Sequence, residues 1–149
     1  MEHAELLKLP KIIYSPPPEL QEASNANFLY YTCDVLTLSG EVIPNLVFHF
    51  EFKPSGYGCN EKYTLHRLGG NGDRRIFQIE VYDKDCPSHT EPNGSRWFGP
   101  HMYYNGLSRK TTATLDCRES HRDKWRRRFC RHTNITIKER VGAFQRPLL

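Results

Sequence analysis

The sequence predicts a single α+β domain: an antiparallel meander sheet of about four to six strands, with a basic helix toward the C-terminus and a short helix at the N-terminus. Three observations favour this fold. The chain has 149 residues, enough for one core that buries roughly two-thirds of the surface of the unfolded chain. Its central part has strand-like composition in four segments separated by turn residues. Its positive charge is concentrated in one late segment with helical spacing.

Three stretches make up this domain, which we expect to span 1–149 without an internal boundary. Residues 1–26 supply the N-terminal helix and a proline-rich linker. The sheet and a histidine-bearing loop occupy 27–104, and the basic helix with a tail occupies 105–149.

The N-terminal segment 2–9 places three leucines on about one face of a short amphipathic helix, which Pro10 ends. Residues 12–14 are apolar enough to pack locally. Three prolines at 16–18 then stiffen the chain into extended polyproline form. The segment 19–23 predicts one helical turn.

Four segments rich in β-branched and aromatic residues predict sequential antiparallel strands. They are 27–38, 42–52, 62–68 and 74–82. A Ser-Gly-Glu turn follows the first strand, and the glycine-rich 69–73 follows the third. In the second strand three phenylalanines alternate with His49 and Glu51, so the phenylalanines face the core and these two residues face away. A short pattern at 110–115 is weakly β.

A helix is predicted over 117–130, because His121, Trp125 and Phe129 recur every fourth residue. This segment and the two residues after it carry seven lysines and arginines against two acids, whereas the rest of the chain is slightly acidic. Such asymmetry points to an acidic or polyanionic partner for this helix. The alternation at 135–137 predicts a last edge strand.

Cations along one helix face would neutralise phosphates and bind RNA or other nucleic acid without sequence preference. The same charges suit docking onto an acidic or nucleic-acid-binding protein complex. Trp125 would stack on an exposed base or anchor the helix. The alternative is an ordinary solvated helix face. The candidate binding residues are Arg122, Lys124, Trp125, Arg126, Arg127, Arg128 and Arg131.

The stretch 86–104, C-P-S-H-T-E-P-N-G-S-R-W-F-G-P-H-M-Y-Y, gathers histidine, arginine and aromatic residues in a turn-rich loop. Histidine acts as general base and general acid near neutral pH, and a guanidinium holds phosphate through two hydrogen bonds. The candidate catalytic residues are His89, His101, Tyr103 and an arginine, Arg67 or Arg96. The alternative is that the histidines make ordinary backbone hydrogen bonds in a structural loop.

A resemblance supports the catalytic interpretation. The run from Arg67 through H-T-E-P-N-G (89–94) to P-H-M-Y-Y (100–104) follows an early L-L-x-L-P-K. It resembles small uncharacterised bacterial and prophage proteins, and it is more distantly similar to toxin ribonucleases of toxin–antitoxin pairs. The resemblance implies metal-independent RNA cleavage. Asn93 stands where the family pattern has an acid, and Tyr103 stands where a second histidine would complete H-x-H.

A zinc site is a further alternative. Cys117, His121, Cys130 and His132 offer four nitrogen and sulfur ligands. Their spacing would let them reach one ion only if the helix breaks. We therefore expect no metal and no other cofactor.

Several classes of protein are disfavoured. There is no apolar run of 18 residues and no secretory signal, so we expect a cytoplasmic protein without a membrane segment. The five cysteines include no C-x-x-C pair, which in a reducing compartment indicates free thiols. No phosphate-binding loop, dinucleotide-binding glycine pattern or nucleophile elbow occurs.

Two hypotheses remain. The first is a small basic nucleic-acid-directed protein of the toxin-ribonuclease type. The second is a non-catalytic interaction protein of phage or mobile-element origin, which inhibits a host defence complex through its basic helix, as anti-CRISPR proteins do. The sequence leaves open whether the protein is an enzyme.

Overall fold

The computed structural model describes residues 2–15, 20–22, 28–53, 60–70, 74–83, 85–104, 106–111 and 119–139. Two α-helices are described, α1 (His3–Lys8) and α2 (Arg122–Thr133), and a short 3-10 helix, η1 (Glu119–His121), precedes the second. The strands are β1 (Lys11–Tyr14), β2 (Gln21–Glu22), β3 (Leu29–Leu36), β4 (Val42–Phe52), β5 (Asn60–Arg67), β6 (Arg75–Tyr82), β7 (Pro87–Thr90), β8 (Arg96–Phe98), β9 (His101–Tyr104), β10 (Leu107–Lys110) and β11 (Ile135–Lys138).

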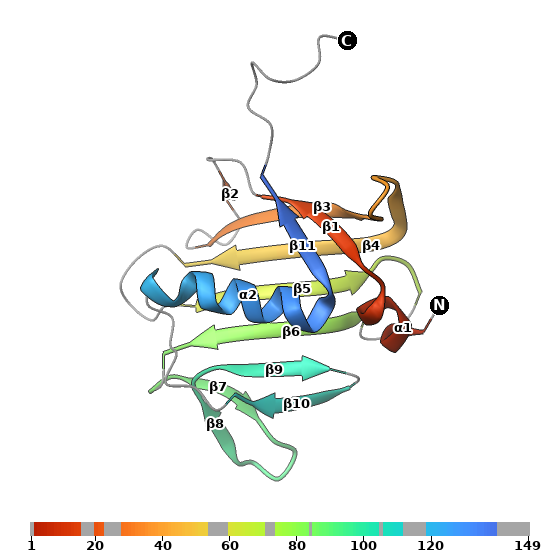
Figure 1. Ribbon diagram of the computed structural model, residues 1–149. Coiled ribbons are helices and arrows are strands. Elements are labelled where there is room, and N and C mark those ends of the chain that lie inside the picture. Colours follow the sequence, from red (N-terminus) through yellow and green to blue (C-terminus); the bar gives the residue numbers. More distant parts are fainter. Residues whose placement is uncertain are drawn as a thin grey trace.

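One large sheet organises the molecule, with strand order β10-β9-β6-β5-β4-β3-β1-β11 and β2 paired to β3 beside this path. The α+β class is confirmed, and so is the antiparallel meander, which is formed by β3 to β6. The expected four to six strands are too few. Eight strands lie on the main path, because short segments before and after the meander also pair with it (Figure 1).

The two edges of the sheet are built differently. On one side β9 and β10 continue the antiparallel pattern beyond β6. On the other side β11 pairs in parallel with β1, so that Lys11 lies opposite Ile135. The predicted edge strand at 135–137 is thereby confirmed. The predicted helical turn at 19–23 is wrong for Gln21–Glu22, which pairs with β3 instead.

The helix α2 lies across one face of the sheet (Figure 1). Trp125 and Phe129 are buried, as their helical spacing predicts. The ring of Phe129 packs against Phe48, Tyr63 and Phe77, with centroids 5.4, 5.9 and 5.8 Å apart. The helix begins at Arg122, later than predicted, and residues 112–118 lie outside the described part of the chain.

Lys11 secures the end of α1. Its side chain is fully buried, and its ammonium donates hydrogen bonds to the carbonyl oxygens of Leu6, Leu7 and Leu9. Burial lowers the pKa of Lys11 from 10.5 to about 8. The ammonium thus satisfies backbone carbonyls that the end of a helix leaves unbonded.

Replacing Lys11 with methionine is expected to lower the free energy of unfolding at pH 7 by about 1–3 kcal/mol, because these carbonyls lose their donor. Between pH 8 and 10.5 the unfolded wild-type chain binds more protons than the folded one, so wild-type stability relative to the variant rises with pH. Urea denaturation at several pH values measures both effects. Lys8→Met, at an exposed position of the same helix, is the matched control. If the difference in the free energy of unfolding between wild type and Lys11→Met stays constant from pH 8 to 10.5, the result would contradict the lowered pKa of Lys11.

Candidate active site

Two strands of different sheets bring the predicted histidines together. His101 begins β9 and pairs in register with Glu80 of β6, whereas His89 lies on β7 opposite Trp97 of β8. The centroids of the two imidazole rings are 5.6 Å apart. We call His89 and His101 the histidine pair.

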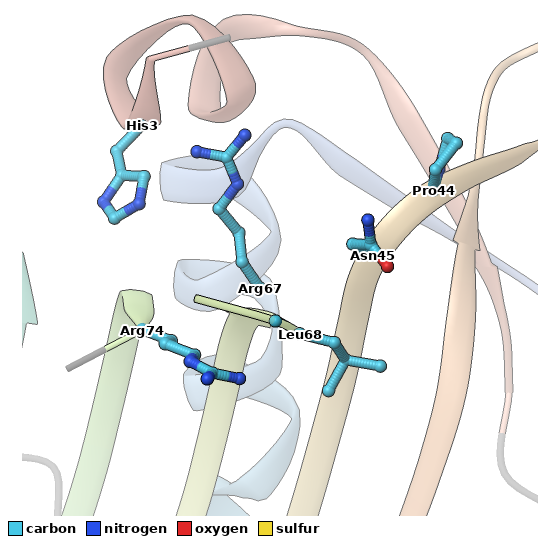
Figure 2. Close-up of a pocket in the computed structure, with 7 residues that line it drawn as sticks. His3, Pro44, Asn45, Arg67, Leu68 and Arg74 are labelled. Carbon is cyan, nitrogen blue, oxygen red and sulfur yellow. The ribbon is translucent and has the colours of Figure 1, made fainter. Parts of the chain in front are cut away.

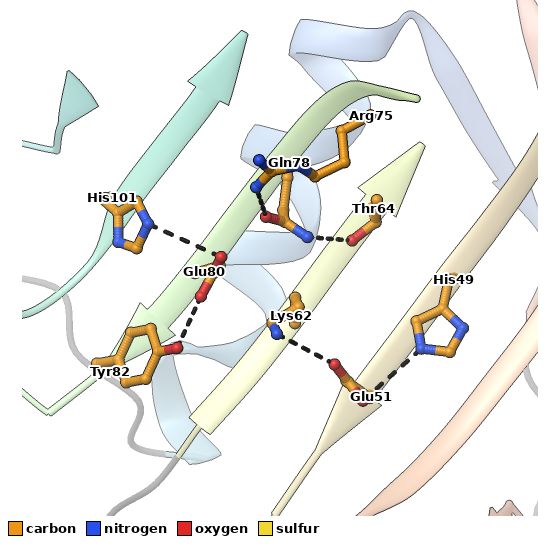
Figure 3. Close-up of polar contacts among 9 residues, drawn as sticks. All are labelled: His49, Glu51, Lys62, Thr64, Arg75, Gln78, Glu80, Tyr82 and His101. Atoms are coloured by element: carbon orange, nitrogen blue, oxygen red, sulfur yellow. Dashed lines mark hydrogen bonds and ion pairs between the residues drawn. The ribbon is translucent and has the colours of Figure 1, made fainter. Parts of the chain in front are cut away.

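His101 points away from α2, because its neighbour Met102 packs against the core and successive strand residues face opposite sides. Its side chain is only 5% exposed, and its Nε2 atom lies 3.8 Å from Oε1 of Glu80. The hydroxyl of Tyr82 donates to Oε2 of Glu80 over 2.7 Å, and the ring of Tyr82 stacks on the imidazole. The hydroxyl therefore orients the carboxylate that faces His101 (Figure 3).

Burial sets the protonation state of His101. Desolvation lowers the pKa of its imidazole below the ordinary value, Glu80 opposes this effect, and positive charge at His89 and Arg75 adds to it. Among the described residues, the buried Nδ1 atom of His101 has no hydrogen-bond partner, although buried polar atoms usually have one. Burial therefore favours the neutral imidazole, which is the form that a general base needs.

His89 is the more accessible member of the pair, with 28% of its side chain exposed. Its ring packs on Trp97 at 4.7 Å, and its Nε2 atom lies 3.8 Å from Oε2 of Glu91. The turn after it is closed by Gly94, whose φ of 90° suits glycine. The amide oxygen of Asn93 accepts a hydrogen bond from the backbone N–H of Ser95. Asn93 therefore has a structural role in this turn.

Tyr103 lies two residues after His101, on the same face of the sheet. The guanidinium of Arg75 lies 3.8 Å above the centre of its ring. Arg75 also donates to Oε1 of Gln78 over 2.9 Å, and Gln78 donates in turn to Thr64 over 2.8 Å (Figure 3). No sequence motif points to Arg75. Its position beside Tyr103 follows from the pairing of β6 with β9, which the sequence does not reveal.

The two predicted arginines differ in position. Arg67 ends β5 on the same face as the buried Leu65, and it is directed toward α1 (Figure 2). It is therefore separated from the histidine pair. Arg96 is exposed on β8, opposite Thr90 of β7, and belongs to the same two-stranded ribbon as His89.

Most of the cations predicted to bind a partner lie exposed on α2, namely Lys124, Arg126, Arg127 and Arg131. Arg126 forms an ion pair with Asp123. Arg122 is engaged internally, because its Nε atom lies 2.8 Å from Oε1 of the buried Glu61. Arg128 is half-buried, with its guanidinium 5.2 Å from the centre of the Trp125 ring.

Trp125 is not accessible for stacking on a base. Its side chain is fully buried in the core between α2 and the sheet, so it anchors the helix, the second of the two roles expected for it. An indole at this position is apolar enough to supply much of the helix's buried surface.

The described residues contain no group of three or more His, Cys, Asp and Glu side chains placed to hold a metal ion. Of the four candidate zinc ligands, Cys117 lies outside the described part of the chain. Burial raises the pKa of the Cys130 thiol to about 11, and the ring of His132 stacks on Phe77. Cys33, Cys86 and Cys130 are free thiols. None of the described helices is long and apolar enough to cross a membrane.

The cluster around the histidine pair thus contains more than the sequence predicts. Glu80, Tyr82, Trp97 and Arg75 join His89, His101 and Tyr103, and they come from four strands. The arrangement combines a neutral imidazole, a second imidazole open to solvent, an oriented carboxylate and a nearby guanidinium. Comparison with protein-family models, curated proteins and solved structures gives no match to this chain.

Proposed function

We propose that this protein is a metal-independent ribonuclease of the toxin type, acting through the histidine pair. The observation that carries the proposal is the 5.6 Å separation of the His89 and His101 rings, which come from two different sheets. Both histidines belong to the turn and strand motifs that resemble small bacterial and prophage proteins and whose order is more distantly similar to that of toxin ribonucleases. The surrounding carboxylate and guanidinium add to the likeness to an acid–base site.

The chemistry needs one group to take a proton and another to give one. The neutral imidazole of His101 takes the proton of a ribose 2′-hydroxyl, whose oxygen forms a bond to the adjacent phosphorus. The bond from phosphorus to the 5′-oxygen breaks, and the imidazole of His89, acting as general acid, gives that oxygen a proton. The products are a 2′,3′-cyclic phosphate and a 5′-hydroxyl, and no metal is required.

Neighbouring side chains are suited to binding the phosphate and stacking a base of the RNA. Arg75 provides a positive charge for the phosphate, the role predicted for Arg67 or Arg96. The ring of Trp97 borders His89 and has the ammonium of Lys110 5.6 Å from its centre. An aromatic ring with a cation beside it is a suitable surface for stacking a base next to the scissile phosphate.

The direct test is incubation of the purified protein with total RNA, with and without a chelator. Cleavage that persists in the chelator is the expected result. Cleavage that needs a divalent metal contradicts the proposed mechanism, and complete inertness contradicts ribonuclease activity itself.

A second candidate function is supported by α2. Its buried face is anchored by Trp125 and Phe129, while Lys124, Arg127 and Arg131 project from the exposed face. A rigid cationic face of this kind suits a nucleic acid, or an acidic surface on a host defence complex that the protein would inhibit without catalysis.

Charge reversal tests whether α2 binds phosphates. Arg127→Glu is expected to weaken binding to single-stranded RNA and to reduce the slope of log affinity against log salt concentration by about 0.7 for each phosphate that the helix no longer neutralises. Fluorescence anisotropy at several salt concentrations measures this slope. Lys138→Glu makes the same charge change at an exposed position of β11 and should have the smaller effect. Equal effects of the two variants would show that only net charge matters.

A further inference from the structure

A pocket of about 350 Å³ lies at the end of the sheet nearest α1 (Figure 2). Its lining includes His3 of α1, Asn45 of β4, Arg67 at the end of β5 with Leu68 after it, and Arg74 immediately before β6. These residues come from four separate parts of the chain. The pocket is distinct from the histidine pair, and the function proposed above does not use it.

The described lining of the pocket is basic. Three of its residues, His3, Arg67 and Arg74, carry nitrogen donors and are half-buried. None of the described residues that line it is an aspartate or a glutamate. Among the ion pairs between described residues, neither guanidinium takes part. Two guanidinium groups beside one cavity, with no carboxylate in its described lining, favour an anion from solution.

The walls of the pocket are held by the backbone. The N–H of Arg67 donates to the carbonyl of Arg74 over 3.1 Å, and the N–H of Leu68 donates to the carbonyl of Asn45 over 2.8 Å. The guanidinium of Arg74 donates to the carbonyl of Gly70. Asn45 adopts a left-handed conformation, with φ of 60°, which costs free energy and occurs often at binding sites. The backbone bonds therefore hold together the strand ends that carry Arg67 and Arg74.

We propose that this pocket binds a phosphate monoester. Arg67 and Arg74 donate paired hydrogen bonds to the phosphate oxygens, and the imidazole of His3, which extends toward Arg67 in Figure 2, adds a further donor. The volume exceeds that of a phosphate alone and falls in the range of small-molecule sites. It therefore has room for part of the group to which the phosphate is attached, such as a nucleoside.

The pocket is independent of the histidine pair. About six residues of β6 separate Arg74 from Glu80, which at about 3.3 Å per residue is about 20 Å. Arg67 shares the sheet face of Leu65, whereas His101 lies on the opposite face. The proposal therefore stands whether or not the protein cleaves RNA, and substitutions in the pocket leave the histidine pair intact.

Calorimetric titration tests the proposal with three probes: inorganic phosphate, uridine 5′-monophosphate and uridine. Phosphate and the nucleotide are expected to bind and uridine is not. Arg67→Met and Arg74→Met should each weaken nucleotide binding at least tenfold. Arg109→Met, on β10 and outside this pocket, should leave nucleotide binding unchanged. If Arg67→Met does not fold, as judged by circular dichroism, Arg74→Met alone decides the result.

A matched pair of oligonucleotides identifies the source of the phosphate. A short RNA with a 5′-phosphate that binds more tightly than the same RNA with a 5′-hydroxyl supports the proposal and assigns the pocket to RNA ends. Equal binding of the two RNAs, together with binding of the nucleotide, supports the proposal and assigns it to free nucleotides. Two results would overturn the proposal. One is equal affinity of wild type and Arg74→Met for the nucleotide. The other is that neither phosphate nor the nucleotide binds.

Discussion

Replacing His89 with alanine is expected to slow RNA cleavage by about 10²- to 10⁴-fold, the usual contribution of a positioned general acid or base. The ring of His89 lies 5.6 Å from that of His101 and is the one open to solvent. Because His89 lies outside the main sheet, on the ribbon of β7 and β8, its loss should leave the fold intact. Single-turnover cleavage of an oligoribonucleotide measures the rate, and thermal unfolding checks the fold.

The matched control is His132→Ala. His132 lies at an exposed position of α2, on the other side of the sheet from His101, and burial lowers the pKa of its imidazole as it does for His101. Cleavage by His132→Ala should stay within about threefold of wild type, since substitutions at exposed positions away from a site usually have small effects. An unchanged rate in His89→Ala would remove this residue from the mechanism.

Replacing Phe129 with alanine is expected to lower the free energy of unfolding by about 3–5 kcal/mol, the usual cost of deleting a buried aromatic ring. Phe129 is 1% exposed, and its ring contacts rings from β4, β5 and β6. Its removal leaves a cavity between α2 and the sheet. Urea denaturation measures the decrease in stability.

Arg131→Ala, at an exposed position two residues further along α2, provides the comparison. It should change the free energy of unfolding by less than about 0.5 kcal/mol. If Phe129→Ala lowers the free energy of unfolding by less than about 1 kcal/mol, then α2 does not depend on this ring to pack on the sheet.

The centre of the fold is well predicted from the sequence because its signals there are local. The strands β3 to β6 alternate apolar and polar residues and lie close together in the sequence, so each is followed by its own partner. The strand β1 and its parallel pairing with β11 are not predicted, because Lys11 pairs with Ile135, more than a hundred residues away. No local pattern reports such a pairing.

The site is predicted in part for the same reason. His89 and His101 are recognisable by residue type, but Glu80 joins His101 only through the register of β6 and β9. The motif order places Arg67 in the site, yet its position relative to Leu65 directs it to the other face. The role of Trp125 is ambiguous in the sequence, since an aromatic residue on a basic helix serves equally well for packing and for stacking.

We propose that the histidine pair cleaves RNA through the 2′-hydroxyl without a metal. The most direct measurement is cleavage of a defined oligoribonucleotide in EDTA, compared with the same oligonucleotide carrying 2′-deoxyribose at the cleaved position. The mechanism predicts a 2′,3′-cyclic phosphate and a 5′-hydroxyl from the first and no cleavage of the second at that position. Failure to cleave the first in EDTA, or cleavage of the second at the same bond, would contradict the claim.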